Sequence, residues 1–167
     1  MAKIFLILTF IFFLTQTLNG TEIYGTPKII DGDTVHINNK KIRLEGIDAP
    51  ELKQQCKKPV LQISVMISFQ FNKNYSCGVK SKVKLINKIS DSKIKCISLS
   101  KDRYKRYLAT CYKDKINLNK WMVRNGYAVA YKRYSKDYVR DEEYAKENKI
   151  GLWKGSFVRP EKWRKLN

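Results

Sequence analysis

The strongest constraint on the fold is a series of short β-type segments near the start of the chain, separated by tight turns. These segments, rich in β-branched residues, are 27–30, 34–37 and 41–44. Asp-Gly-Asp and Asn-Asn-Lys sequences separate them, and both are typical of turns between strands of a β-meander. Acidic motifs lie at the turns and strand ends, where a rigid scaffold presents side chains to a ligand.

Hydrophobic periodicity along the rest of the chain predicts further strands and helices. The predicted strands are 93–99, 107–112 and 127–131, and the predicted helices are 78–89, 117–125 and 138–149, the last capped by Asp137. The aromatic tail after these elements is expected to fold back onto the body. The sum predicts an α+β fold that is mainly β, a five-stranded OB-like barrel with about three helices, in one domain over residues 21–167.

Residues 60–71 alternate apolar and polar side chains over a length that favours one half-buried strand. Because this stretch lies between Cys56 and Cys77, we interpret residues 57–76 as an extra apolar strand or lobe held by a disulfide. This lobe could form a wall of the substrate site or a dimer surface. We favour the third interpretation, in which its apolar face covers the core.

The first 20 residues resemble a secretory signal peptide. Lys3 precedes an apolar run from Ile4 to Leu14, and polar residues follow. The run is shorter than the roughly 20 apolar residues that a membrane span needs. No clear cleavage site is present, so an uncleaved membrane tether stays open. We expect a secreted or periplasmic protein without a stable membrane span.

Four cysteines in an exported chain are expected to form disulfides. They are Cys56, Cys77, Cys96 and Cys111. The last two lie symmetrically about Arg103-Tyr104, like partners across a hairpin, which favours the pairs Cys56–Cys77 and Cys96–Cys111 over the two other pairings. A zinc site is disfavoured because there is no Cys-x-x-Cys spacing and only 1 histidine.

Three carboxylates and an arginine in a short stretch indicate metal-assisted hydrolysis of a phosphodiester. Asp33 and Asp48 each lie beside a Gly or Pro turn and are candidate ligands of Ca²⁺, although aspartates are also ordinary turn formers. Glu51 is the candidate general base or water-positioning group. Arg43, on the preceding strand, is the candidate phosphate ligand.

The net charge of the chain limits the classes of partner that it is expected to bind. Lys and Arg number 34 against 15 Asp and Glu, a formal net charge of +19, which favours a polyanion such as nucleic acid.

The single histidine excludes two-histidine nuclease mechanisms. A non-catalytic OB-fold protein that binds nucleic acid or another polyanion is the alternative, and action on membranes or partners through residues 60–71 is a third. A pure binder gains little from acids that face a phosphate, so the nuclease is favoured.

Several motifs together resemble the thermonuclease, or staphylococcal nuclease-like, family. The matching segments are 30–34, 43–51, 102–106, 118–128 and 151–153. The resemblance implies a five-stranded OB barrel and Ca²⁺-dependent endonuclease cleavage of DNA and RNA that leaves 3′-phosphates. We expect single strands to be the preferred substrate, because aromatic residues among cations suit base stacking, and we expect a monomer.

The resemblance also implies roles for individual residues. Asp33 and Asp48 would ligate Ca²⁺, together with the backbone carbonyl of Ala49. Glu51 would act on the attacking water, while Arg43 and Arg106 would bind the phosphate and stabilise the transition state. The implied substrate-binding residues are Tyr104, Tyr131 and Arg103. Lys105 departs from the family, which usually has Gly there; if this position needs a positive φ, Lys costs about 1 kcal/mol.

Overall fold

The computed structural model describes residues 20–63 and 69–167. The strands are β1 Thr21–Gly25, β2 Lys28–Ile29, β3 Thr34–Ile37, β4 Lys40–Leu44, β5 Ile47–Asp48, β6 Gln55–Ile63, β7 Phe69–Ser76, β8 Ile94–Lys101, β9 Tyr107–Lys113, β10 Ile116–Asn117 and β11 Val129–Ala130. The helices are α2 Cys77–Ile89, α3 Leu118–Arg124, α4 Val139–Glu147 and α5 Pro160–Leu166, with a 3₁₀ turn at Gly151–Lys154. The predicted signal peptide, apart from Gly20, lies outside the described residues.

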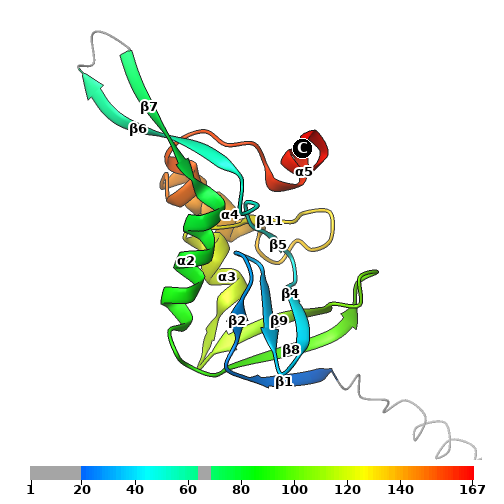
Figure 1. Cartoon of the computed structure of the whole chain (residues 1–167). Coiled ribbons are helices and arrows are strands. Elements are labelled where there is room, and N and C mark those ends of the chain that lie inside the picture. Colours follow the sequence, from blue (N-terminus) through cyan, green and yellow to red (C-terminus); the bar gives the residue numbers. More distant parts are fainter. Residues whose placement is uncertain (1–19, 64–68) are drawn as a thin grey trace, which may run out of the picture.

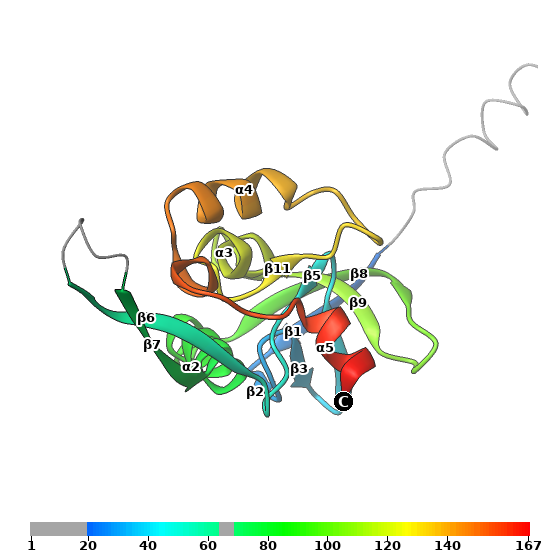
Figure 2. The same cartoon turned by 90° about the horizontal axis from the view of Figure 1, so that it is seen from above.

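One curled sheet forms the body of the molecule (Figures 1 and 2). Its strand order is β1-β8-β9-β4-β3-β2, with β10 beside β9. All pairs are antiparallel except β4 with β9. The Asn38 side chain, in the turn after β3, donates a hydrogen bond of 3.2 Å to the Tyr24 carbonyl on β1 and so links this turn to the β1 edge of the sheet. The predicted α+β, OB-like fold is confirmed, with four α-helices in the described part instead of about three.

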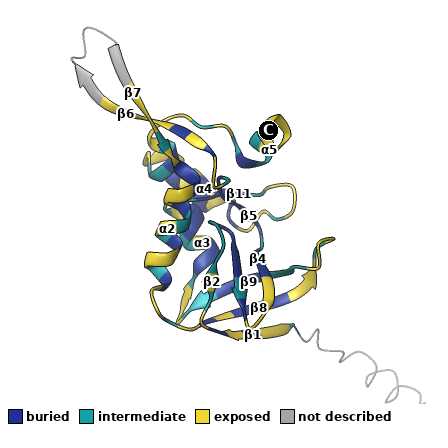
Figure 3. Cartoon of the chain, viewed as in Figure 1, coloured by how far each residue is buried: buried dark blue, intermediate teal, exposed yellow. Residues whose placement is uncertain are grey.

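The core fills the inside of the curled sheet and is covered by helices. Strand residues such as Ile37 and Ile42 are 0% exposed, and so is Leu85 of α2. Because Ser81, Leu85 and Ile89 are spaced by four residues, α2 buries one face and turns exposed and partly exposed residues outward (Figure 3). Each fully buried Leu or Ile contributes about 1.5–3 kcal/mol through the hydrophobic effect. This packing holds α2 against the sheet.

The lobe predicted at residues 57–76 is a hairpin and not one strand. β6 and β7 pair antiparallel with each other in a two-stranded sheet (Figure 1), and Lys57 of β6 also forms an antiparallel bridge with Ser156. Residues 64–68 lie outside the described part. The two disulfides are Cys56–Cys77, which ties the base of the hairpin to α2, and Cys96–Cys111, which joins β8 to β9; this is the pairing that the sequence favours.

Two other features of the helices differ from or add to the sequence prediction. Asp137 does not cap α4; the helix has Tyr138 at its N-cap and no side-chain cap, while the Asp137 amide donates to Ser135 Oγ at 3.1 Å. The tail also contains a helix, α5, that periodicity did not predict. Among the described residues, no helix is both long enough and apolar enough to cross a membrane.

Candidate active site

Three predicted site residues meet at the ends of neighbouring strands. Asp33 immediately precedes β3, Arg43 lies in β4 opposite Thr34, and Asp48 ends β5. The Arg43 guanidinium donates from Nη1 to Asp33 Oδ1 at 2.6 Å and from Nη2 to Asp48 Oδ1 at 3.0 Å. The Ala49 amide donates to Asp33 Oδ2 at 2.7 Å. The meander and the following loop therefore assemble two carboxylates around one arginine.

The carboxylates of this cluster are buried, and burying a negative charge is electrostatically unfavourable. Asp33 is 4% exposed and Asp48 1% exposed. Desolvation raises the pKa of Asp48 even though Arg164 and Arg43 oppose it. Burial, followed by the negative charge of Asp33, raises the pKa of Asp31 to about 6. Positive charge at this point, from an arginine or a cation, offsets the cost of burying carboxylates.

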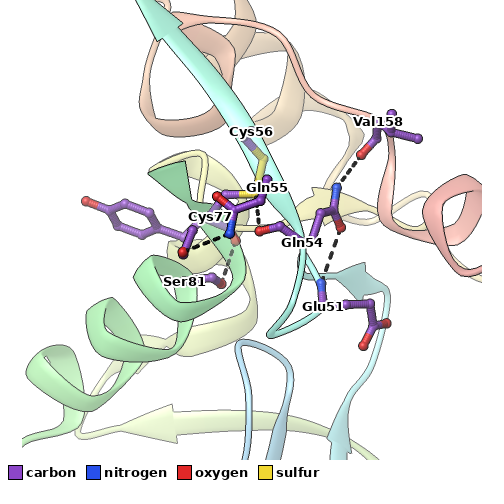
Figure 4. Close-up of a disulfide and its surroundings, with 9 residues drawn as sticks. Glu51, Gln54, Gln55, Cys56, Cys77, Ser81 and Val158 are labelled. Carbon is purple, nitrogen blue, oxygen red and sulfur yellow. Dashed lines mark hydrogen bonds between the residues drawn. A yellow bond between two sulfur atoms is a disulfide. The ribbon is translucent and has the colours of Figure 1, made fainter. Parts of the chain in front are cut away.

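The loop that carries Glu51 is fixed by a buried glutamine. Gln54 is fully buried; its Oε1 accepts from the Glu51 amide at 3.3 Å, and its Nε2 donates to the Val158 carbonyl at 2.7 Å (Figure 4). A Cβ at Gly78, in the first turn of α2, would collide with the Glu51 carbonyl. The close approach of α2 thus sets the position of the Glu51 backbone, while its carboxylate remains half-buried.

A second arginine of the cluster, Arg164, which sequence reasoning missed, reaches Asp48 and Glu51 from α5. Arg164 Nη1 donates to Asp48 Oδ1 at 2.9 Å and to Glu51 Oε1 at 2.7 Å, and its Nη2 donates to Asp48 Oδ2 at 3.1 Å. Burial lowers the pKa of Arg164, but the hydrogen bonds to these two carboxylates outweigh burial and raise this pKa above its ordinary value. Glu51 joins the cluster through this arginine.

Arg106 is not part of this ion-pair network. It directly precedes β9, whose first residue, Tyr107, lies beside Ile42 of β4. Its guanidinium instead pairs with Asp102, with Nε and Nη2 at 2.8 and 2.7 Å from Oδ2. Lys105 has φ of +62°, so the position does adopt the left-handed conformation that suits Gly.

The predicted substrate-binding residues fall into two groups. Tyr104 is 64% exposed, and its ring lies 4.9 Å from the Arg103 guanidinium carbon and 5.5 Å from that of Arg106. Tyr131 lies elsewhere, where its amide donates to the Gly46 carbonyl at 2.9 Å. Burial, followed by the charge of Asp48, raises the pKa of the Tyr131 phenol. Tyr104 therefore lies beside the two arginines Arg103 and Arg106, and Tyr131 lies beside the carboxylate cluster.

A pocket of about 150 Å³ adjoins the carboxylate cluster. Its lining residues are Asp48, Val129, Ala130, Tyr131, Lys132, Arg133, Arg159 and Glu161. It combines a carboxylate from the cluster, an aromatic ring and several cations. These groups suit a nucleotide whose base contacts the ring and whose phosphate faces the cations.

The donor set of the cluster suits a hard cation. Asp33 and Asp48 supply buried carboxylate oxygens, the ligand type that Ca²⁺ prefers. Within residues 20–63 and 69–167, no three acidic, His or Cys side chains already converge as a metal cage. Asp33 Oδ1 and both oxygens of Asp48 accept hydrogen bonds from guanidiniums, while Asp33 Oδ2 accepts from the Ala49 amide. A cation that used Asp48 would therefore have to replace arginine contacts.

Comparisons with known proteins agree with this geometry. Residues 41–155 match the family model described as "Staphylococcal nuclease homologue". An uncharacterized endonuclease of Haemophilus influenzae is 36% identical over 83% of this chain and 70% of its own length. An uncharacterized endonuclease of Escherichia coli O157:H7 is 30% identical over 86% of each chain. The succinoglycan biosynthesis protein ExoI of Rhizobium meliloti is 31% identical over 84% of this chain and 70% of its own length.

Proposed function

Because this chain belongs to the staphylococcal nuclease homologue family, we propose that it is an exported, Ca²⁺-dependent nuclease that hydrolyses phosphodiester bonds of DNA and RNA. Nuclease activity is supported by the family and by the relatives named as endonucleases. The observation that carries the finer proposal is the network of Asp33, Asp48 and Arg43 at the strand ends, with Glu51 in the adjoining loop.

The residues of this network have complementary roles in the proposed reaction. Asp33, Asp48 and the Ala49 carbonyl would hold Ca²⁺, which when bound would neutralise negative charge on the scissile phosphate. Glu51 accepts a proton from the attacking water, and its half-exposed carboxylate can meet that water from solvent. Arg43 and Arg106 bind the phosphate oxygens and stabilise the charge that develops on them. The water oxygen forms a bond to phosphorus as the bond to the 5′-oxygen breaks; the 5′-oxygen takes up a proton and leaves as a hydroxyl, and a 3′-phosphate remains.

The chain also carries features that suit the proposed substrate and location. Tyr104 beside Arg103 and Tyr131 in the pocket offer aromatic faces near cations, which suits the unstacked bases of single strands. Two disulfides suit an oxidising compartment outside the cytosol. The signal-like residues 1–20 support export, either with cleavage or as an uncleaved tether.

The decisive experiment compares Glu51→Gln with the native enzyme on single-stranded and duplex DNA, with Ca²⁺ or with a chelator. Removing a general base costs roughly 10²–10⁴-fold in rate, so Glu51→Gln should lose at least about 100-fold while its affinity for DNA stays within a few-fold. Glu143→Gln, an exposed change on α4, is the matched control and should cut normally.

Two results would contradict parts of the proposal. Undiminished cleavage by Glu51→Gln would remove Glu51 from its assigned role. Tight, salt-sensitive DNA binding by the native protein without any cleavage in Ca²⁺ would leave the alternative, a non-catalytic OB-fold protein that binds nucleic acid or another polyanion.

A further inference from the structure

Arg164 is bound to the carboxylates that would hold a metal ion and act on water. It contacts both oxygens of Asp48 and one oxygen of Glu51. Asp48 Oδ1 also accepts from Arg43 at 3.0 Å. A carboxylate oxygen has about two lone-pair positions, so Asp48 Oδ1 is saturated by the two arginines. A cation can use Asp48 fully only if at least one guanidinium withdraws.

The two arginines differ in how easily they can withdraw. Arg43 lies within the sheet on β4, its side chain is 16% exposed, and it also pairs with Asp33. The Arg164 side chain is 35% exposed and belongs to a helix in which Pro160 is the only buried residue. Helices with few buried apolar contacts open at low free-energy cost. Arg164 is therefore the arginine that a cation would displace.

The chain just before α5 is anchored, so the helix can move without releasing the rest of the tail. Arg159 Nη1 pairs with the buried Glu142 at 2.6 Å, and its Nη2 donates to the Ala130 carbonyl at 3.0 Å. The Val158 carbonyl accepts from Gln54 at 2.7 Å. In Figure 1, α5 lies at the end of the molecule near β5 and β11, away from β1. Withdrawal of Arg164 therefore requires only the chain after Arg159 to move.

We propose that Arg164 is a further positioning residue of this site: it holds Asp48 and Glu51 when no metal is bound, and a divalent cation must displace it, which releases α5. This inference rests on the proposed function, because it takes Asp48 as a metal ligand and Glu51 as the group that acts on water. By linkage, each binding event weakens the other by the same factor. If α5 is closed in about nine molecules of ten, the apparent affinity for the cation falls about tenfold.

The test measures metal binding directly, without nucleic acid and without turnover. Isothermal titration with CaCl₂ is carried out on the native oxidised protein, on Arg164→Gln and on Lys165→Gln. The last variant removes an exposed charge from the same helix and therefore measures the general effect of charge. We expect Arg164→Gln to bind Ca²⁺ about tenfold more tightly than the native protein, and Lys165→Gln to differ little from it.

Hydrogen–deuterium exchange gives a second readout on the same samples. Saturating Ca²⁺ should speed the exchange of the α5 amides in the native protein, while in Arg164→Gln these amides should exchange fast with or without Ca²⁺. Exchange in α3, which belongs to the core, should not change.

Each alternative result has a definite meaning. Equal Ca²⁺ affinity of the native protein and Arg164→Gln, or weaker binding by Arg164→Gln, would overturn the displacement of Arg164 and leave the proposed nuclease intact. An equal gain in Ca²⁺ affinity in Lys165→Gln would also overturn the displacement of Arg164, because the gain would then come from the loss of any positive charge on α5. Absence of Ca²⁺ binding in all three proteins would overturn the calcium site itself, and with it both the proposed cofactor and this inference.

Discussion

Lys105 occupies a backbone conformation that costs energy for any residue with a Cβ. Its φ is +62°, and the left-handed region costs a non-glycine residue roughly 1–2 kcal/mol. Lys105→Gly should relieve this strain, offset by about 0.4–1 kcal/mol for the added freedom of the unfolded chain. The expected net gain in the free energy of unfolding is about 0.5 kcal/mol, measured by urea denaturation. Lys105→Ala keeps the strain, so an equal gain in that variant would contradict the explanation.

Asp102 beside Arg106 makes stability depend on pH in a predictable direction. Burial raises the pKa of Asp102, but the hydrogen bonds from Arg106 outweigh burial and lower this pKa below its ordinary value of 3.8. A lowered folded-state pKa stabilises the protein above the unfolded-state value, and this contribution is lost as pH falls through the folded-state value. Asp102→Asn should therefore be less stable than the native protein at neutral pH. Urea denaturation at about pH 2 should show a smaller difference; an unchanged difference would count against the ion pair.

The clustering of the candidate site residues was predictable where the chain places them close together. Asp33, Arg43, Asp48 and Glu51 lie on one meander and its following loop, so turn chemistry and spacing bring them to one place. Arg164 pairs with Glu51 across 113 positions of sequence, and nothing in its local pattern distinguishes it from other basic residues. Gln54 reads as a surface residue, and only the fold buries its amide between Glu51 and Val158.

The contact between α2 and the Glu51 loop is the element-scale feature on which the site most depends. A Cβ at Gly78 would meet the carbonyl of Glu51 and the Cα of Leu52. Because backbone cannot yield as a side-chain tip does, Gly78→Ala should move the loop, lower the free energy of unfolding by roughly 1–3 kcal/mol and reduce the cleavage rate. Urea denaturation and DNA cleavage measure both effects. Val79→Ala, at an exposed neighbour (46%), is the control; a native-like Gly78→Ala would refute the dependence.

Hydrophobic periodicity predicts the helices that bury one face and misses the helix that does not. α2 and α3 bury a mainly apolar or small-residue face, and α4 buries Ala145 beside the carboxylates Asp141 and Glu142; the sequence predicts the bounds of each helix within about two residues. α5 buries only Pro160 and is attached through Arg164, so it carries no apolar stripe. Alternation continues through residues 60–71 without a Gly, Pro or Asn to signal a turn, which is why a hairpin was read as one strand.

The whole molecule has a strong positive charge, and part of it is organised along α2. The helix has no acidic residue, and Lys80, Lys84 and Lys88 follow one another at four-residue spacing. Their ammonium groups lie over the rings of Tyr75, Tyr127 and Trp121 at 5.2, 5.8 and 5.3 Å. Burial, followed by the charges of Lys58, Lys84 and Lys154, lowers the pKa of Lys80. A phosphate backbone laid along this face would relieve that repulsion.

The salt dependence of DNA binding tests whether a strand follows this face. Each phosphate contact on a single strand contributes about 0.7 to the slope of log K against log salt. Changing Lys80, Lys84 and Lys88 to Gln in the Glu51→Gln background should therefore reduce that slope by roughly 2, measured by fluorescence anisotropy in chelator. The control changes Lys115, Lys136 and Lys149, three exposed lysines in turns and loops outside α2, and removes the same charge. If both triple variants lower the slope equally, the molecule attracts nucleic acid through its overall charge; a loss confined to the first places the strand along α2.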